Sequence, residues 1–548
     1  MAHALAGKPV QEQDIIDVQT IVDAYFDNVP DMTNPTQLVS FGTSGHRGTS
    51  VDGTFTDLHV AAITQAICDG RKQFGATGPI FVGQDTHALS QPALVTVLEV
   101  LAGNGVTAMV DCDMAFVPTP SVSRAIIRYN EEHDDKADGI IITPSHNPPD
   151  NGGIKYNTII GGPADTVVTK WIEMRANGYL TAYCESEDFK RISIDNIEPT
   201  AQVPYDYKGL YVEELGDVIN MEAIKAAGPK VLVDTLGGSG ASYWNAIKER
   251  YGLDLTIIHD DYDPTFSFMT YDHDGKVRMD CSSTYVMASV INRIGDFDLA
   301  VGNDPDYDRY GIVVSSGLIS ANTFLTLAAR YLFTTRGWKN KGVGKTVVCT
   351  TMIDKWAADA ETPVFEVPVG FKYFSQLLFD GAIGIGGEES AGASFLKKDG
   401  TVWTTDKDGM IMALLSMEIM AVMGKSALKM ADESVEEFGN PKFGRIDAPC
   451  KKEQKQILKQ MSAELITATT VDGDPITNIR TTSLYNDMPI DGVRVETDKG
   501  WFVARPSGTE DLYKIYGESY KGDLGLVALL TAGEEIVNAA LNGTIETE

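Results

Sequence analysis

The 548-residue chain lacks several features that would assign it to a familiar class of protein. Its six cysteines are scattered without a close pair, which argues against both a disulfide framework and a zinc site. Basic residues are in deficit, since 45 lysines and arginines stand against 77 aspartates and glutamates, for a formal net charge of −32. Nucleic acids and anionic membranes both require a basic face, so we expect neither as a partner.

Membrane-length apolar runs are missing as well. No uninterrupted apolar stretch approaches the ~20 residues that cross a bilayer. The N-terminal residues do not combine a basic region with an apolar core. Together with the scattered cysteines, these absences predict a cytoplasmic protein in a reducing compartment.

Three common catalytic motifs are also absent. Residues 237–241 read G-G-S-G-A and miss the last glycine of the G-x-S-x-G turn that presents a hydrolase nucleophile. Neither a P-loop nor an intact G-x-G-x-x-G occurs. A nucleotide kinase and a dehydrogenase are therefore disfavoured.

The chain does contain repeated alternations of strand and helix patterns, which predict three tandem α/β modules. The first has strands over 79–82, 106–110 and 139–142, a turn over 83–86, and a helix over 92–102 capped by Ser90. The second has strands over 230–234 and 255–258 and a helix over 241–251. The third has strands over 346–349, 364–367 and 382–385 and a helix over 373–379.

The C-terminal part of the chain differs from these modules. Helix patterns over 452–468 and 526–541 flank strands over 492–496 and 501–504, which indicates an α+β domain with antiparallel pairing. We therefore predict three mixed-sheet α/β modules followed by an α+β domain. The expected bounds are an N-terminal helix and arm over 1–40 and domains over 41–205, 206–320, 321–440 and 441–548.

The most informative segment is Thr143–Pro148, which reads T-P-S-H-N-P and follows the apolar strand pattern 139–142. Ser145 is thus delivered at the end of a buried strand, on a loop held by two prolines and beside His146. Strand ends are where α/β domains bring reactive groups to ligands. The loop predicts a reactive serine, and its partners must come from elsewhere in the chain.

A second segment, Asp304–Arg309, carries three aspartates at alternate positions after another strand pattern. Alternate positions of an extended segment point to one side, so three hard oxygen ligands converge, as Mg²⁺ or Ca²⁺ prefers. An EF-hand is excluded because its sixth position, a glycine, is Arg309 here and its twelfth, a glutamate, is Ser315. The alternative is three solvated loop acids. A divalent metal site is favoured because grouped carboxylates repel one another without a cation.

Three glycine-containing loops complete the set. Residues 386–392, G-G-E-E-S-A-G, can bind vicinal sugar hydroxyls, or they can be the acidic first turn of a helix. Residues 505–510, R-P-S-G-T-E, with Lys514 nearby, can form a phosphate cradle or an ordinary turn. Residues 41–48, F-G-T-S-G-H-R-G, place Ser44, His46 and Arg47 between glycines, as an anion-binding loop or a flexible connector.

Taken in this order, the segments resemble the α-D-phosphohexomutase superfamily, whose members carry a phosphoserine loop, a metal loop, a sugar loop and a phosphate loop, one in each domain. The resemblance covers roughly residues 40–520. Within the superfamily, the sugar loop Gly387–Ser390 resembles that of the branch acting on glucose phosphates, and the length and the long N-terminal arm resemble its bacterial members. The resemblance implies four domains around a central cleft.

The resemblance also implies a role for each motif residue. Ser145 carries the phosphoryl group, and Asp304, Asp306 and Asp308 hold Mg²⁺ together with an oxygen of phospho-Ser145. Catalytic roles are implied for Arg47, Lys155 and His146, the last two as candidates for the base. Substrate contacts are implied for Ser44, Arg309, Lys372, Glu388, Ser390, Arg505, Ser507, Gly508, Thr509 and Lys514. Lys514 stands where the family often has an arginine, and a lysine binds phosphate as a point charge rather than as a fork.

The implied reaction exchanges a phosphoryl group between the 1- and 6-positions of a hexose, through a sugar 1,6-bisphosphate. The expected partners are small hexose phosphates bound by a monomer or homodimer. Glucose is the favoured sugar. Mannose and glucosamine phosphates, and a non-catalytic sugar-phosphate binder, are the alternatives.

Overall fold

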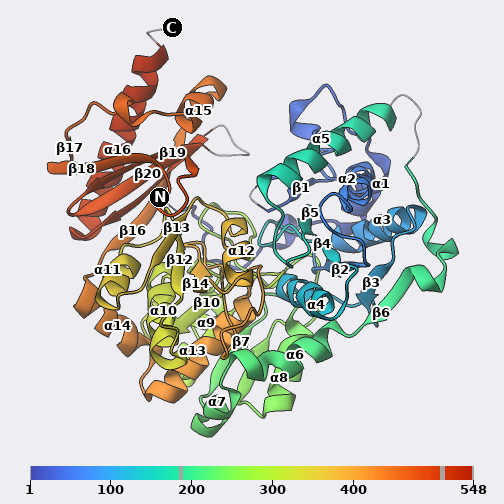
Figure 1. The fold of residues 1–548 in the computed structure, drawn as a ribbon, viewed down its shortest axis with the longest axis horizontal. Helices are drawn as coiled ribbons and strands as arrows, with labels where there is room; N and C mark the ends of the chain where they lie inside the picture. The colour runs from blue at the N-terminus through green and yellow to red at the C-terminus, as the bar shows by residue number, and fades with distance from the viewer. Residues whose placement is uncertain (1, 43, 184–188, 507–511, 546–548) are drawn as a thin grey trace. The chain divides into compact units, whose positions relative to one another are not determined.

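The structure is a computed structural model that describes residues 2–42, 44–183, 189–506 and 512–545 (Figure 1). The chain forms two compact units. The first comprises Met1–Ala321, Phe374–Gly381 and Ser390–Leu428. The second comprises Asn322–Tyr373, Ala382–Glu389 and Lys429–Glu548.

The N-terminal part of the first unit is a six-stranded mixed sheet in the order β1-β5-β4-β2-β3-β6. Strands β4, β2, β3 and β6 are parallel, and β5 is antiparallel to β4 and β1. The strands are β1 (His46–Thr49), β2 (Ile80–Gln84), β3 (Ala108–Asp111), β4 (Asp138–Ile142), β5 (Asn151–Asn157) and β6 (Gln202–Tyr205). The helices are α1 (Val18–Asp27), α2 (Asp57–Gly70), α3 (Ser90–Gly103), α4 (Thr119–Glu132) and α5 (Thr166–Tyr183).

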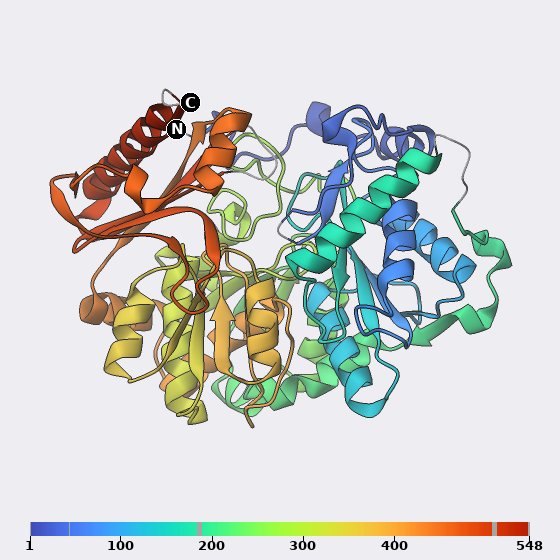
Figure 2. The ribbon, with the colours of Figure 1, turned by 45° about the horizontal axis from the view of Figure 1, so that its top comes forward.

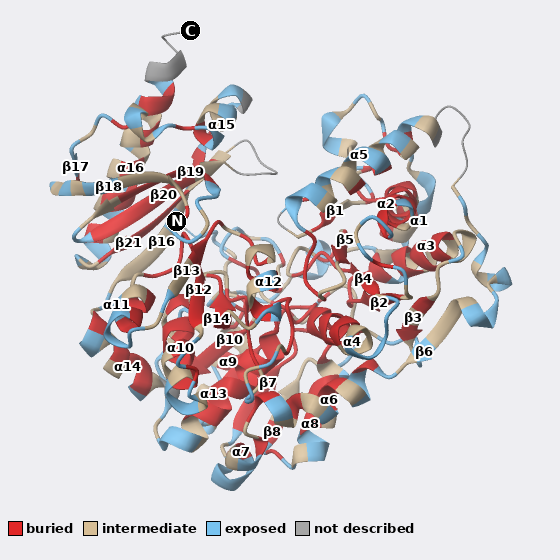
Figure 3. Cartoon of the chain, in the orientation of Figure 1, coloured by how far each residue is buried: buried red, intermediate tan, exposed pale blue. Residues whose placement is uncertain are grey.

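Helices cover both faces of this sheet, which explains the continuous apolar pattern of its central strands. Ile140 and Ile142 of β4 face the core formed with α2, α3 and α5. Ile141, between them, points to the opposite face and packs with Val122 and Ile126 of α4. Figure 3 shows β4 buried along its length. The carboxyl end of β4 therefore leads directly from a rigid, buried strand into Thr143 and Ser145.

The second sheet of the first unit has the order β11-β10-β9-β7-β8. Its strands are β7 (Val231–Asp234), β8 (Leu255–Ile258), β9 (Leu299–Gly302), β10 (Gly311–Val314) and β11 (Gly317–Leu318). Helices α6 (Tyr207–Val218), α7 (Met221–Ala227), α8 (Ala241–Tyr251) and α9 (Ala288–Ile291) accompany it. The N-terminal arm is tied to this part of the chain by a bridge between Pro9 and Thr270. The unit also holds β15 (Ala393–Phe395) and α13 (Gly409–Met423).

The second unit contains the parallel strands β12 (Gly342–Thr346), β13 (Val364–Val367) and β14 (Ile383–Gly387), with β12 in the middle. Helices α10 (Ala321–Arg336) and α11 (Met352–Asp359) belong to this region, and α12 (Lys372–Phe379) and α14 (Ala427–Phe438) run from one unit into the other. The polar composition of β12, G-V-G-K-T, contrasts with its burial. The Lys345 ammonium is accommodated there because it pairs with Asp354.

An antiparallel sheet in the order β16-β21-β20-β19-β18-β17 forms the C-terminal domain. Its strands are β16 (Lys442–Pro449), β17 (Thr470–Val471), β18 (Asp474–Thr482), β19 (Pro489–Thr497), β20 (Gly500–Pro506) and β21 (Leu512–Ser519). Helices α15 (Lys452–Lys459) and α16 (Gly522–Ile545) lie on one side of it (Figure 2). On the other face, Trp501 and Val503 pack against Val347 and Val348, the residues after β12.

Helix α16 is long and apolar enough to cross a membrane by length and composition alone, and 39% of its apolar window is buried inside the protein. Leu529, Leu530, Val537 and Leu541 of this helix pack in the core of the C-terminal sheet. This packing is that of a core helix, so the length and composition of α16 are weak grounds for a membrane span.

The four-domain α/β and α+β organisation predicted from the sequence is confirmed, whereas several element bounds are wrong. The predicted strand 346–349 is wrong beyond its first residue, because β12 ends at Thr346 and residues 347–349 form a turn. The helix predicted over 452–468 ends at Lys459. Ser90 lies inside α3 rather than capping it, and its hydroxyl donates to Asp85. The first two predictions continue an element beyond the residue at which it ends in the structure.

Candidate functional site

Ser145 lies in the tight loop that follows β4. Its backbone φ is 59°, a left-handed conformation that costs a residue with a Cβ about 1–2 kcal/mol. The side chain is 1% exposed, and its Oγ donates to Asp304 Oδ2 at 2.8 Å. The loop therefore holds a serine hydroxyl in a strained conformation, aimed at a carboxylate from a different sheet.

The three aspartates predicted as metal ligands follow β9 and converge as expected. Each of Asp304, Asp306 and Asp308 offers a carboxylate oxygen, and these oxygens lie within 4.8 Å of one another, all on buried residues. Among the described residues, Asp306 Oδ1 and Asp308 Oδ1 have no hydrogen-bond partner. Burial, followed by the charges of its two neighbours, raises the pKa of Asp304 well above its ordinary value. Orphaned, mutually repelling carboxylate oxygens fit a divalent cation.

Two lysines neutralise part of this acidic cluster. Lys155 Nζ lies 2.6 Å from Asp306 Oδ2 and 3.1 Å from Asp308 Oδ2. Lys407 Nζ lies 2.9 Å from the same Asp308 oxygen. Burial would lower the pKa of Lys155, but the charges of Asp306 and Asp308 outweigh burial and raise it. Lys155 is therefore held in the acidic cluster as a buried ammonium group, and Lys407 contacts one of the same carboxylates.

Arg309 and His146 share a further carboxylate, Asp280. Arg309 Nη1 lies 3.6 Å from Asp280 Oδ2, and His146 Nε2 lies 3.9 Å from it. His146 Nδ1 lies 3.4 Å from Ser145 Oγ. Burial, then the positive charge of Arg309, holds the pKa of His146 well below its ordinary value. The imidazole is therefore neutral, next to the serine hydroxyl.

Arg47 extends the positive side of the site from β1. Its guanidinium donates to Asn147 Oδ1 and to Ser44 Oγ, both at 3.3 Å. Burial lowers the pKa of Arg47, although the acidic cluster counteracts the effect. Within the first unit, the structure thus brings these predicted residues into one site: Ser44, Arg47, Ser145, His146, Lys155, Asp304, Asp306, Asp308 and Arg309.

Ser390 also belongs to the first unit. It lies in the segment that joins the start of β10, where Tyr310 N donates to the carbonyl of Ala391 and Arg309 forms a bridge with Gly392. The sugar loop is therefore anchored, through its second half, to the strand that follows the aspartate cluster.

The other predicted substrate residues lie in the second unit. Glu388 is 5% exposed and directly follows β14. Lys372 begins α12, and its Nζ lies 5.5 Å from the ring centroid of Tyr373. Arg505 donates from Nε to the carbonyl of Ile490 at 2.9 Å and lies opposite Lys514 across β20 and β21. Ser507, Gly508 and Thr509 lie outside the described residues.

Several residues of the site were missed by the sequence reasoning. Lys407 lies within the polar run T-T-D-K-D-G (404–409), which directly precedes the apolar pattern of α13, and this run was its available signal in the sequence. Asp280 and Thr119 offered no comparable local pattern. Thr119 Oγ1 donates to Asp306 Oδ2 at 2.8 Å, and Thr119 N donates to the Asp306 carbonyl. The Thr119–Asp306 and His146–Asp280 contacts join segments more than a hundred residues apart, which a local motif cannot reveal.

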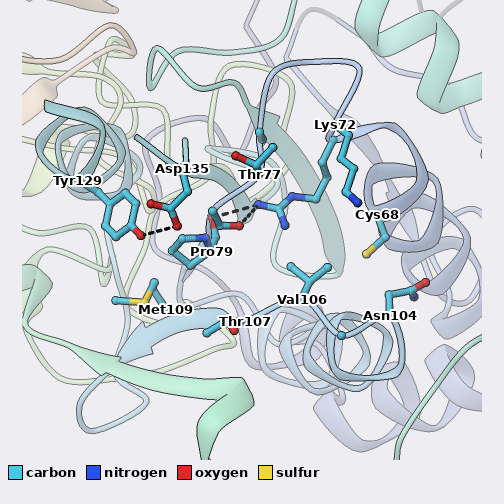
Figure 4. Close-up of a pocket in the computed structure, with 14 residues that line it drawn as sticks. Cys68, Lys72, Thr77, Pro79, Asn104, Val106, Thr107, Met109, Tyr129 and Asp135 are labelled. Atoms are coloured by element: carbon cyan, nitrogen blue, oxygen red, sulfur yellow. Dashed lines mark hydrogen bonds between the residues drawn. The ribbon is translucent and has the colours of Figure 1, made fainter. Parts of the chain in front are cut away.

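A separate pocket of about 610 Å³ lies at the opposite edge of the first sheet, near the amino ends of β2 and β3 (Figure 4). Lys72, Thr77, Asn104 and Thr107 are among its lining residues. The buried guanidinium beneath it, Arg71, is committed to Asp138 and to the carbonyls of Gly78 and Pro79. The chemistry predicted from the sequence gathers instead at the carboxyl edge, around Ser145.

Four family models match the chain in succession. They describe phosphoglucomutase/phosphomannomutase α/β/α domain I over residues 38–181, domain II over 210–317 and domain III over 320–438, and the C-terminal domain over 446–524. The resemblance stated from the motifs is thereby confirmed domain by domain.

Curated relatives and solved structures agree with these matches. The chain is 46% identical to a phosphoglucomutase of Komagataeibacter xylinus over 97% of both chains, and 26% identical to phosphoglucomutase 1 of Saccharomyces cerevisiae over 88% of both. Parafusin of Paramecium, a phosphoglucomutase, shares the fold with a TM-score of 0.72 at 19% identity, covering 94% of this chain and 96% of that one. A Burkholderia thailandensis phosphoglucomutase/phosphomannomutase family protein shares it with a TM-score of 0.70 at 20% identity, covering 91% and 97%. The chain belongs to the α-D-phosphohexomutase superfamily of isomerases.

Proposed function

We propose that the protein is a phosphoglucomutase, which interconverts glucose 1-phosphate and glucose 6-phosphate through phospho-Ser145 and bound glucose 1,6-bisphosphate. One observation carries the proposal. In a chain 46% identical to a phosphoglucomutase, the buried Ser145 Oγ is hydrogen-bonded to the first carboxylate of an acidic cluster that suits a divalent cation. A serine in this setting can accept and return a phosphoryl group.

Each half-reaction moves one phosphoryl group. The bond between phosphorus and Ser145 Oγ breaks as phosphorus bonds to a free sugar hydroxyl, whose proton passes to a base. The bisphosphate then turns round. The bond between the sugar oxygen and its other phosphoryl group breaks as that phosphorus bonds to Ser145 Oγ, and the sugar oxygen takes up a proton. The transferred group carries negative charge on its equatorial oxygens, so Arg47, Lys155 and Lys407 would act by electrostatic stabilisation.

His146 and Lys155 are the proposed candidates for the base. The neutral imidazole lies 3.4 Å from Ser145 Oγ and can accept a proton there. Lys155 is bonded as an ammonium to two carboxylates, and it accepts a proton only after losing one. Both are kept as candidates, since proton transfer requires hydrogen-bond reach first and a suitable pKa second.

Asp304, Asp306 and Asp308 are proposed to hold Mg²⁺ together with an oxygen of phospho-Ser145. A bound divalent cation neutralises such carboxylates and draws charge from phosphoryl oxygens. The orphaned oxygens of Asp306 and Asp308 support this assignment. Hard, all-oxygen ligands favour Mg²⁺ over softer metals.

The remaining contacts are assigned to the sugar and its second phosphate. Glu388, Ser390 and Lys372 are proposed to bind sugar hydroxyls. Arg505, Ser507, Gly508, Thr509 and Lys514 are proposed to bind the phosphate that does not react. The register of β20 and β21 supports the last group, because it places Arg505 and Lys514 directly opposite each other. Arg309 is proposed to contact the phosphate on Ser145.

The proposal keeps the sequence-derived domain bounds of 41–205, 206–320, 321–440 and 441–548 around a central cleft, with the arm over 1–40. It also keeps a cytoplasmic monomer or homodimer that binds neither nucleic acid nor membrane. Mannose and glucosamine phosphates remain the alternative substrates, and a non-catalytic sugar-phosphate binder remains the alternative class.

Intact mass spectrometry together with a coupled glucose 1-phosphate assay tests the function. We expect a phosphate that maps to Ser145, and turnover that requires Mg²⁺. Ser145→Ala should abolish turnover, whereas Ser416→Ala, which removes another buried serine hydroxyl, should not. Full activity of Ser145→Ala would overturn the relay. Faster turnover of mannose 1-phosphate or glucosamine 1-phosphate than of glucose 1-phosphate would overturn the choice of sugar.

A further inference from the structure

The carboxylate of Asp85 lies behind the Ser145 loop and makes four hydrogen bonds, although it is not part of the site described above. Asp85 follows β2 and is 1% exposed. Its Oδ1 accepts from Ser90 Oγ at 2.5 Å and from His87 N at 3.0 Å. Its Oδ2 accepts from Thr143 Oγ1 at 2.6 Å and from His87 Nδ1 at 2.9 Å. Two of these donors, Thr143 and His87, continue into the Ser145 loop.

Thr143 connects the Asp85 carboxylate to the backbone of Ser145. A hydroxyl has one proton, and that of Thr143 goes to Asp85, so the Thr143 oxygen faces the loop as an acceptor. The backbone N–H of Ser145 donates to this oxygen at 2.7 Å. The residue held in the left-handed conformation is thus tied to Asp85 through one intermediate atom.

His87 provides the second link, on the far side of Ser145. Its Nε2 lies 3.0 Å from the carbonyl oxygen of Asn147, while Nδ1 lies 2.9 Å from Asp85. Both partners are acceptors, so both ring nitrogens must carry a proton, and the buried ring is an imidazolium paired with Asp85. Burial disfavours this charge, but Asp85 outweighs burial and raises the pKa of His87.

We propose that Asp85 and His87 are positioning residues for Ser145, the phosphoryl carrier. Asp85 holds the loop before Ser145 by its hydrogen bond with Thr143. The His87 imidazolium holds the loop after Ser145 by its hydrogen bond to the Asn147 carbonyl. The pair holds Ser145 in a conformation that the residue would otherwise leave. It also fixes Asn147, whose side chain accepts from Arg47. The serine hydroxyl, its strained backbone and an active-site arginine therefore share one support.

Besides the hydrogen-bonded groups, the charge of Asp306 acts on His87, and the charge of Asp85 acts on Tyr262. Ser90 Oγ occupies Asp85 Oδ1, and the ring of Phe266, from the neighbouring domain, packs at 5.1 Å from the His87 ring. Among the described residues, the side-chain hydrogen bonds of Asp85 and His87 thus join the Ser145 loop, the pair itself and Ser90 at the start of α3, which is the arrangement of a support and not of a second reaction centre.

Kinetic measurements on folded variants test whether Asp85 and His87 position Ser145. This test rests on the proposed function, because it measures mutase activity. We expect His87→Gln and Thr143→Val to lower kcat about 10²-fold, because a misplacement of about 1 Å can cost that much, while KM stays within about twofold. Thr143→Ser, which restores the hydroxyl, should recover most of kcat. His59→Gln is the matched control, since His59 is equally buried in the same domain and bonds the Gln37 carbonyl away from the loop.

Nitrogen NMR of the full-length, ¹⁵N-histidine-labelled protein tests the support independently of turnover. Two protonated ring nitrogens on His87 are expected at neutral pH, with the resonance identified by its loss in His87→Gln. A neutral His87 ring would overturn the proposal, and so would wild-type kcat in folded His87→Gln or in Thr143→Val. If the wild-type protein bears no mutase activity, the proposed function fails, and the ring protonation alone decides on the support. If His87→Gln does not fold, the comparison of Thr143→Val with Thr143→Ser decides.

Discussion

Asp304 is the residue whose side chain bears most directly on metal binding, because it accepts from Ser145 and lies beside two further acids. Burial and those neighbours raise its pKa, so the carboxylate is costly to keep ionised without a cation. We expect Asp304→Asn to melt no lower than the wild type in EDTA. In Mg²⁺ the wild type should gain about 2.7 kcal/mol at ~100 times Kd, and Asp304→Asn should gain little. Thermal melts with and without Mg²⁺ measure both effects.

The control for this substitution is Asp261→Asn, which removes an exposed acid elsewhere in the same domain. It should keep the full Mg²⁺ gain. An equal Mg²⁺ gain in Asp304→Asn and the wild type would show that the three aspartates do not form the metal site.

Sequence reasoning found the residues whose motif lies within one short segment of the chain. Ser145 and the three aspartates each follow an apolar strand within one segment, so strand ends and alternation sufficed. Lys407 and His87 could not be found in this way. Lys407 meets Asp308 across 99 residues and His87 meets Asn147 across 60, and only the folded chain makes them neighbours.

At the scale of elements, the glycine loop before α8 supports the metal loop and is not a nucleophile turn. Ser239 N and Oγ both donate to the Pro305 carbonyl at 2.8 Å. A Cβ on Gly240 would lie 2.4 Å from the ring of Tyr307, a buried residue with φ of 62° between two of the aspartates. The loop therefore needs glycine because an aromatic ring occupies the space a side chain would take.

Gly240→Ala should consequently destabilise the protein by about 1–3 kcal/mol and weaken Mg²⁺ binding, because Tyr307 must move and carries the aspartates with it. Gly295→Ala is the matched control, since nothing lies within 4 Å of a Cβ there. Urea unfolding and calorimetric Mg²⁺ titration measure the two effects. Unchanged Mg²⁺ affinity in Gly240→Ala would separate the glycine loop from the metal loop.

Strand β19 carries a partly buried charge network that ties it to its neighbours. Glu496 lies 2.6 Å from Arg494 and 3.1 Å from Arg480, which also pairs with Glu366 at 2.5 Å. Burial would raise the pKa of Glu496, but the two arginines lower it from 4.5 to about 2. Its ionised form therefore stabilises the fold above pH 4.5, and that contribution is lost as the pH falls towards 2.

We expect Glu496→Gln to lower the free energy of unfolding at neutral pH by roughly 2 kcal/mol, with the difference from the wild type shrinking below pH 4.5. Denaturant titrations at several pH values measure it. Glu535→Gln, on the exposed side of α16, should change little at any of them. A difference for Glu496→Gln that does not depend on pH would contradict the ionised network.

Some elements of the C-terminal domain escaped sequence analysis for a physical reason. Strands β16 and β18 are only partly buried and mix polar with apolar residues, so their alternation is weak. Strands β19 and β20 were found because Val493, Val495, Phe502 and Ala504 all face one core. Strand β21 was missed as well, although most of it is buried, so burial alone does not account for every strand.

At the scale of the whole molecule, the candidate site around Ser145 and the charge network of Glu496 lie in different compact units. Ser145, the three aspartates and both lysines lie in the first unit, whereas Glu496 and its arginines lie in the second. The formal charge of −32 makes the local gathering of cations around Ser145 the more necessary for an anionic substrate. Since stability is not uniform across a protein, a ligand should protect first the unit that binds it.

Hydrogen exchange in moderate urea tests this division on the full-length protein. Mg²⁺ should slow exchange in peptides from β4 and β9, because those strands lead into the serine and the aspartates, and should change peptides from β19 and β20 much less. Glu496→Gln should show the reverse pattern, with faster exchange confined to the second unit. Asp304→Asn serves as the control for Mg²⁺, since the protection of β4 and β9 should disappear with the site. Equal protection of all four strands by Mg²⁺ would mean that the two units unfold as one cooperative body, because only then does binding in the first unit stabilise the second by the same free energy.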